Sequence, residues 1–303
     1  MIDLSEQEFV ARLRDLEWVA AAAGGLDATE QTRVALESFQ RHPFAVAAGR
    51  YADNCGAALG LSAAAATNAA RLNLAGHARG FIQHGSPLVR ELDAAWARRC
   101  LDAGGGPADV ALPERGTLVL TWHGPEYHLL FCCLGLLGAR VFPVVAPESA
   151  AMFHRHVAGY LKRLHDDTRR NFGGGDYVFI EDGEATARQV GEKLAAGATV
   201  VALMDNHFHD GRGQGKFSGE IFGRSTTPRA GVIKLAIAGG YRILVASNVF
   251  DWAAGRHCLL ARAVSENSMR GVIDAYFRFL AEAVARRPEC WDGWYWFDAL
   301  PAA

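Results

Sequence analysis

A short apolar run at residues 117–122 passes directly into a polar turn that carries a histidine. The run reads Thr-Leu-Val-Leu-Thr-Trp, and its β-branched and aromatic residues are typical of a buried strand. In the turn that follows His123, Pro125 suits the first turn of a helix, and residues 129–137 are almost wholly apolar. Ligands of open α/β sheets bind in the turns at the carboxyl ends of strands. The sequence therefore predicts that His123 lies at the reactive centre.

The order of the elements around this turn predicts an α/β fold. Strands are expected at 117–122, 141–145, 177–180, 199–204, 242–249 and 257–264, and helices near 126–138, 149–170, 184–196, 228–240 and 268–286. Such alternation indicates a mainly parallel sheet flanked by helices. Residues 1–106 are rich in alanine and predict a helical N-terminal region, with helices opening at Ser5, Asp27 and Ser62. The Gly-rich stretch 102–107 predicts the boundary with an α/β core over 107–303.

Composition excludes several classes of function. Among 303 residues, 50% are hydrophobic and 21% charged, and the net charge of −2 argues against a nucleic-acid partner, which needs a basic surface. The 6 cysteines are scattered without a Cys-x-x-Cys pair, which favours a reducing compartment. The N-terminus lacks the pattern of a signal peptide, and no apolar stretch is long enough to span a membrane. We therefore expect a cytoplasmic protein with at most a peripheral contact at the inner membrane face.

Two polar clusters follow predicted strands. The first holds His123, Glu126 and His128; a histidine that acts as a base needs a partner on its other nitrogen, although His123 could instead cap the helix beneath it. The second, at 204–211, contains Asp205, His207 and His209, and is equally compatible with a solvated loop.

Two further clusters are candidates for binding an anion. Arg169 and Arg170 precede a predicted strand and have the geometry to grip phosphate, but they also fit a solvated helix end. The segment 221–228 contains Arg224 and leads into a helix, whose N-terminus suits an anion. Ser225 or Thr227 is as plausible there as a plain N-cap.

The order of these clusters resembles that of the lysophospholipid acyltransferase superfamily, in its lipid A lauroyl/myristoyl acyltransferase branch. That branch has a His-Phe-Gly-Asn-Trp-Glu type motif after a strand, an Arg-rich stretch ending in Phe-Gly, a Lys-Gly turn before a strand ending in Asp, a Phe-Phe-Gly-x-x-x-Thr element before a helix with Leu-Ala, and a closing Pro-Glu-x-Trp. The corresponding segments here are 123–130, 169–173, 192–205, 221–240 and 287–291. The resemblance covers roughly residues 115–298.

The resemblance implies an acyltransferase that moves an acyl chain from an acyl-carrier-protein or CoA thioester to a hydroxyl or amine acceptor. His123 matches the general base that activates the acceptor. At the position where the family has the carboxylate that orients the base, this chain has His128. Three interpretations are open: Glu126 takes over the orienting role, His128 itself orients His123, or the dyad is broken. Arg169, Arg170 and Arg224 are expected to bind phosphate of a substrate, and Asp205 to organise the neighbouring loop. The thioester is a co-substrate, no bound cofactor or metal is expected, and the acceptor is a small molecule or a lipid.

Two alternatives come from other classes. His123, His128, His207 and His209, with Asp205, could form the site of a metal-dependent hydrolase, because zinc sites combine such ligands with an open position. A non-catalytic acyl-binding descendant of the family would also explain the altered dyad.

Overall fold

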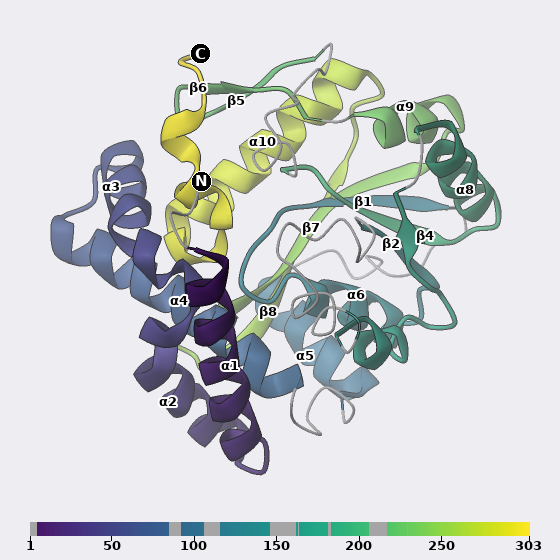
Figure 1. The fold of residues 1–303 in the computed structure, drawn as a ribbon. Coiled ribbons are helices and arrows are strands. Elements are labelled where there is room, and N and C mark those ends of the chain that lie inside the picture. The colour runs from purple at the N-terminus through teal and green to yellow at the C-terminus, as the bar shows by residue number, and fades with distance from the viewer. Residues whose placement is uncertain are drawn as a thin grey trace.

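A six-stranded mixed sheet forms the centre of the molecule (Figure 1). The computed structural model describes residues 5–84, 92–105, 116–145, 162, 164–180, 183–205, 217–228 and 230–303. The strands are β1 (Thr117–Thr121), β2 (Val141–Val145), β3 (Val178–Phe179), β4 (Thr199–Leu203), β7 (Arg242–Asp251) and β8 (Arg256–Val264). Their order is β3-β2-β4-β1-β7-β8, and every neighbouring pair is parallel except β7 with β8. The carboxyl ends of β1, β4 and β7 therefore share one edge of the sheet.

Helices cover both faces of the sheet. On one face lie α8 (Gly183–Ala195), α9 (Gly231–Ala238) and α10 (Met269–Arg286), and on the other α5 (Ala94–Gly104) and α6 (His128–Leu136). Successive residues of a strand point to opposite faces, so Leu118 and Leu120 pack with the first group and Val119 with the second. Every residue of β1 and β4 is buried, as expected for parallel strands covered on both sides, and α6 is buried from His128 to Gly135.

The N-terminal helices join this core. They are α1 (Glu6–Ala23), which Ser5 opens with a capping box, α2 (Ala28–Ser38), α3 (Ala48–Leu59) and α4 (Ala63–His84). Tyr51 of α3 and Leu74 of α4 are fully buried in the same apolar cluster as β1 and the Trp-rich C-terminal segment. Tyr51 also donates a hydrogen bond from its hydroxyl to the carbonyl of Pro288 (2.6 Å). The helical region is thus packed onto the sheet layers through a shared core.

The sequence predicted most of these elements correctly. The α/β class, the parallel sheet, the helical N-terminal region and all strands of the main sheet are confirmed, with ends that differ by a few residues. Two helices, α3 and α5, were not predicted, and most of the expected helix at 149–170 lies outside the described residues. The expectation that the segment 221–228 leads directly into a helix capped by Ser225 or Thr227 is wrong. This segment instead contributes to an antiparallel hairpin of β5 (Gly219–Ile221) and β6 (Arg224–Thr226), and the N-cap of α9 is Ala230 rather than Ser225 or Thr227.

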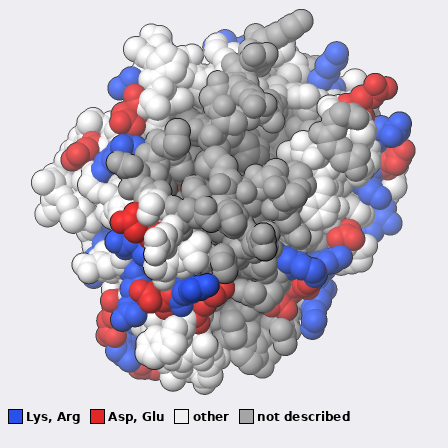
Figure 2. Space-filling model, in the orientation of Figure 1, with Lys and Arg blue, Asp and Glu red and all other residues white. Residues whose placement is uncertain are grey.

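The described surface carries charges of both signs. On the face drawn in Figure 2, described Lys and Arg side chains are interspersed with Asp and Glu around the rim. None of the helices within the described ranges combines the length and apolar character needed to cross a bilayer.

Candidate active site

His123 lies just beyond the carboxyl end of β1, and Asp205 just beyond the carboxyl end of β4. Because the two strands are hydrogen-bonded neighbours in parallel register, with Thr121 opposite Leu203, their first polar turns meet. The His123 Nδ1 atom is 2.7 Å from Asp205 Oδ1. The backbone N–H of His123 donates to the same carboxylate, at 3.1 Å from Oδ1 and 2.9 Å from Oδ2. Asp205 therefore fixes both the ring and the main chain of His123.

The carboxylate of Asp205 is itself held in place. It is 2% exposed, and the indole N–H of Trp291 donates to its Oδ2 at 3.2 Å. An ionised carboxylate only accepts hydrogen bonds, so the neutral His123 ring carries its proton on Nδ1 and its lone pair on Nε2. This is the tautomer that a general base requires when its second nitrogen faces a substrate.

Opposing effects set the pKa of His123. Burial alone lowers the pKa of this imidazole, but the negative charge of Asp205, its hydrogen bond and the charge of Asp292 outweigh burial. The net effect raises the pKa above the ordinary 6.5. Carboxylates thus stabilise the imidazolium that forms when His123 accepts a proton.

The orienting partner predicted from sequence was different. Glu126 is 3% exposed and binds the equally buried Arg79 through Oε2 and Nη1 at 3.0 Å. His128 is buried in α6 with its ring beside that of Tyr127, at a centroid distance of 5.9 Å. Neither residue is the hydrogen-bond partner of His123 Nδ1. That partner is Asp205, which was expected only to organise the neighbouring loop.

Glu126→Gln should therefore act mainly on stability. Removing one charge from a buried ion pair leaves the guanidinium of Arg79 uncompensated, which costs about 3–5 kcal/mol. Urea denaturation followed by circular dichroism would measure the loss. Glu30→Gln is the matched control, because Glu30 pairs with Arg33 on an exposed helix face, and its loss should change stability little. An unfolding free energy of Glu126→Gln equal to that of the control would contradict this assignment.

Helix α4 packs on the turn that carries His123. Gly76 and Gly80 form the contact stripe: a Cβ built on Gly76 would lie 2.6 Å from Pro125 Cβ, and one on Gly80 would lie 3.5 Å from the Pro125 carbonyl oxygen. Asn73 and His77 form a second stripe, and Arg79 and Gln83 a third. Residues four apart share a helix face, so these pairs define three adjacent stripes. Because the two glycines allow α4 to lie close against the turn, the polar stripes on either side of them reach opposite sides of the turn.

A methyl group on the glycine stripe should disturb this packing. We expect Gly76→Ala to lower the free energy of unfolding by about 1–3 kcal/mol, the usual cost of overpacking, despite the better helix propensity of alanine. Gly191→Ala is the control, because Gly191 lies inside α8 with no atom near its built Cβ and should gain about 0.5–1 kcal/mol. Thermal and urea unfolding of both variants would check that the free energy of unfolding decreases in Gly76→Ala and increases in Gly191→Ala.

The second stripe of α4 meets a buried carboxylate from the C-terminal segment. Asp292 is 6% exposed, and its Oδ1 accepts from Asn73 Nδ2 and lies within hydrogen-bond distance of His77 Nε2, at 3.0 Å in each case. The backbone N–H of Asp292 donates to the carbonyl of His123 (3.0 Å). Burial raises the pKa of Asp292, but the charge and hydrogen bond of His77, with the bond from Asn73 and the charge of His123, bring the pKa below 3.8. Asp292 is therefore an ionised neighbour of the candidate base.

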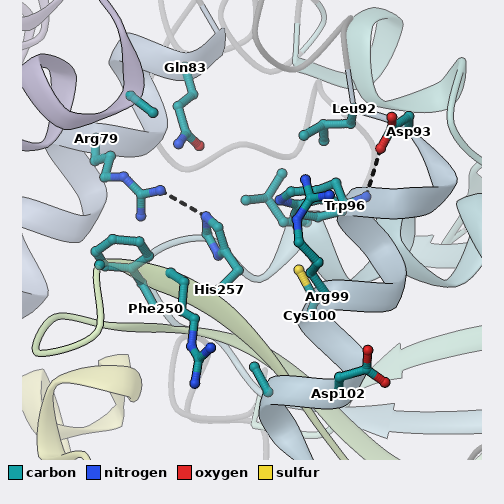
Figure 3. A pocket seen from close by; sticks show the side chains of 15 residues that line it. Arg79, Gln83, Leu92, Asp93, Trp96, Arg99, Cys100, Asp102, Phe250 and His257 are labelled. Atoms are coloured by element: carbon teal, nitrogen blue, oxygen red, sulfur yellow. Dashed lines mark hydrogen bonds between the residues drawn. The ribbon is translucent and has the colours of Figure 1, made fainter.

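The third stripe of α4 lines a cavity of about 680 Å³ (Figure 3). The cavity lies between α4, α5, the start of α6 and the tip of the β7–β8 hairpin, with Leu129, Trp96 and Phe250 among its apolar lining residues. Arg79 Nη2 donates to His257 Nε2 at 2.9 Å, and the guanidinium lies 3.5 Å from the centroid of the Phe250 ring. The volume of this cavity falls within the range of sites that bind small molecules.

The predicted arginine ligands do not join His123 in the structure. Val141 N donates to the carbonyl of Phe172 at the start of β2, so Arg169 and Arg170 lie at the amino edge of the sheet, opposite to His123. Arg169 pairs with Asp166 at 2.6 Å, and Arg170 is exposed. Arg224 Nη1 donates to the carbonyl of Leu300 at 2.9 Å on the β5–β6 hairpin.

The chain shows no match to a protein-family model or to a curated protein.

The residues of the metal-site alternative are only partly described. His207 and His209 lie outside the described residues. Among the residues that are described, no group of His, Cys, Asp and Glu side chains is arranged to hold a metal ion. His123 and Asp205 face each other through a hydrogen bond.

Several residues of the site were missed at the sequence level. Asn73, His77, Arg79 and Gln83 are polar residues at four-residue spacing within an Ala-rich helix, and this pattern is a detectable signal. Asp292 stands between Trp291 and Trp294, and a lone charge within an aromatic segment is a second signal. His257 carries no such signal, because only the tertiary fold brings it to Arg79.

Proposed function

We propose that this protein is an acyltransferase that moves an acyl chain from a CoA or acyl-carrier-protein thioester to a hydroxyl or amine acceptor. The observation that carries the proposal is the His123–Asp205 pair at the adjoining carboxyl ends of β1 and β4. The motif series that resembles the lipid A acyltransferase branch supplies the reaction class, and the pair supplies the base that this class needs. The acyltransferase type of the α/β fold is part of the same proposal.

The chemistry assigns one role to each member of the pair. His123 Nε2 accepts the proton of the acceptor as its oxygen or nitrogen attacks the thioester carbon. The carbon–sulfur bond then breaks, and the departing thiolate receives a proton from the His123 imidazolium. Asp205 holds the ring in the correct tautomer and stabilises its positive charge through both steps.

The cavity beside α4 is suited to an apolar part of a substrate. Leu129, the first apolar residue after the His123 turn, lines it, and Trp96 and Phe250 add aromatic surface. The Arg79–Glu126 pair connects the cavity wall to the same turn. This proximity supports placing the acyl chain of the donor in the cavity.

Release of free thiol from lauroyl-CoA and lauroyl-acyl-carrier protein, with intact-mass detection of the acylated acceptor, tests the proposal. We expect His123-dependent release that chelators leave unchanged. Release that requires one tightly bound metal ion per chain would favour a hydrolase instead. Thioester binding without any release would favour a non-catalytic acyl-binding protein.

The pH dependence of the reaction should show the raised pKa of His123. A general base works in its neutral form, so kcat/KM should rise with pH and reach a plateau above the pKa of His123. Because the carboxylates raise that pKa, the midpoint of the acidic limb should lie above pH 6.5. A pH profile with saturating donor would measure it, and a midpoint below 6.5 would contradict the charge balance described for the site.

A further inference from the structure

The side-chain amide of Asn248 is buried, and only its oxygen has a hydrogen-bond partner. Asn248 lies in β7, is 4% exposed, and its Oδ1 is 2.8 Å from His257 Nδ1. Its Nδ2 has no hydrogen-bond partner among the described residues. A buried N–H donor without an acceptor is costly, so this group is a candidate for binding a ligand that brings an acceptor oxygen.

The neighbouring groups fix the direction in which this amide points. A guanidinium only donates hydrogen bonds, so His257 Nε2 accepts from Arg79 at 2.9 Å. Burial, together with the charge of Arg79, holds the pKa of His257 well below 6.5, so the ring is neutral and donates from Nδ1 to Asn248 Oδ1. His257 belongs to β8, on one side of β7. The Nδ2 group of Asn248 is therefore turned to the other side, where β1 lies.

The register of the strands places Asn248 level with the candidate base. When the parallel pairings of β1 with β4 and with β7 are extended past the end of β1, Asp205 and Asn248 fall on either side of His123. The hydrogen bond between His123 and Asp205 confirms the first of these positions. Residues two apart in a strand face the same side of the sheet, and Val119 and Ala246 face α5 and α6. The side chain of Asn248 thus lies on the same face as that of His123.

A small cleft brings the amide to the turn that carries His123. Asn248, Gly124 and Pro125 line it, together with Trp252 and Cys290, and its volume is about 20 Å³. Gly124 and Pro125 follow His123 directly in the chain. A space of this size holds about one water-sized group and is too small for an alkyl chain. The cleft is therefore suited to a single oxygen atom of a substrate.

Two carboxylates also border the cleft, and neither forbids a negative charge on that oxygen. Glu126 is paired with Arg79 at 3.0 Å. Burial raises the pKa of Glu289, so this side chain takes up a proton more readily than an exposed glutamate when negative charge develops beside it. An oxyanion in the cleft therefore meets one paired carboxylate, one readily protonated carboxylate and the N–H donor of Asn248.

We propose that Asn248 Nδ2 binds the carbonyl oxygen of the thioester and stabilises the oxyanion of the tetrahedral intermediate, an inference that rests on the proposed acyl transfer. When the acceptor attacks the thioester carbon, the π electrons of the carbonyl move onto this oxygen, and the proton of the acceptor goes to His123. When the intermediate collapses, the carbonyl re-forms, the carbon–sulfur bond breaks and the thiolate takes the proton from His123. An amide fixed in advance is effective because it need not reorganise as the charge develops.

Asn248→Asp tests the role of the N–H donor, because it keeps an acceptor for His257. Single-turnover thiol release from lauroyl-CoA should fall by about 10²–10³-fold, the effect of removing one oxyanion donor. The Kd of the donor should change little, since the hydrogen bond strengthens mainly in the transition state. Thr121→Val is the matched control: Thr121 is fully buried in β1, its Oγ1 has no partner among the described residues, and its loss should leave turnover unchanged. Unchanged release in Asn248→Asp, or equal losses in both variants, would overturn the inference.

A change in the substrate separates oxyanion binding from a structural role. In the dithioester analogue of lauroyl-CoA, a sulfur atom replaces the carbonyl oxygen, and sulfur is a weaker hydrogen-bond acceptor. The wild-type protein should therefore prefer the thioester. Asn248→Ala should reduce this preference by about 10- to 100-fold, the effect of one hydrogen bond to a charged group. A variant that is merely damaged in structure loses activity with both donors alike, so an unchanged preference would contradict the oxyanion role.

A complex of the wild-type protein keeps the test valid if the Asn248 variants fold poorly. In the ketone analogue of lauroyl-CoA, a methylene group between the sulfur and the carbonyl prevents transfer. A crystal structure with this analogue should place the ketone oxygen within about 3.2 Å of Asn248 Nδ2. A ketone oxygen bound elsewhere, with His123-dependent thiol release intact, would overturn the role of Asn248 alone. Absence of His123-dependent release from every thioester would overturn the acyl-transfer proposal and the role of Asn248 together.

Discussion

Asp205→Asn should lower acyl-transfer turnover by about 10⁴-fold. Serine proteases lose about that factor when the aspartate of their triad becomes asparagine, because the amide selects the wrong imidazole tautomer. The same change here would let an N–H of the amide face His123 Nδ1 and would place the ring proton on Nε2, where the base must act. Single-turnover kinetics with lauroyl-CoA would measure the loss.

The matched control for Asp205→Asn is Glu126→Gln compared at a temperature where both variants are folded. Glu126 belongs to the Arg79 pair, so its variant should keep most of its turnover while losing stability. A silent Asp205→Asn together with a crippling Glu126→Gln would return the orienting role to Glu126.

His123→Ala should lower turnover by at least about 10³-fold with little effect on folding. The variant removes the proton acceptor, and general-base catalysis contributes roughly 10²–10⁴-fold. Its ring is partly exposed, with a side-chain accessibility of 20%, so the substitution leaves no large buried void. Product detection by intact mass, with circular dichroism as the folding check, would measure the effect.

His128→Gln provides the comparison for His123→Ala, because His128 lies five residues later in the same strand-to-helix segment. We expect a much smaller loss from this variant, since Asp205 occupies the orienting position. Near-normal turnover in His123→Ala would remove this residue from the mechanism whatever the fold.

Local sequence patterns were sufficient to predict the strands of the main sheet. The run 117–121 is apolar and β-branched, and it forms β1 with every residue buried. The hairpin of β5 and β6 was not recognised because each strand has only three residues, too few for an alternating pattern to emerge. The short α5 was missed because its apolar face is narrow, with Ala97 and Cys100 as its buried residues.

The partner of His123 depended on information that local patterns do not contain. Asp205 is 82 positions away and reaches His123 only because β4 lies next to β1 in the sheet. Alternating strands and helices predict parallel pairing but leave the order of strands open. The same limitation explains Arg169 and Arg170: the order of motifs along the chain does not say at which edge of the sheet each one lies.

The three stripes of α4 also constrain how this protein can diverge. Each residue advances the helix by about 100°, so one inserted or deleted residue between Asn73 and Arg79 would rotate one stripe away while leaving the other in place. Insertions or deletions in loops elsewhere in the chain would not change the angle between these stripes. Helix α4 therefore works as a fixed angular spacer between the Asp292 carboxylate and the cavity wall, and related chains that keep both contacts should keep the separation between the positions of Asn73 and Arg79.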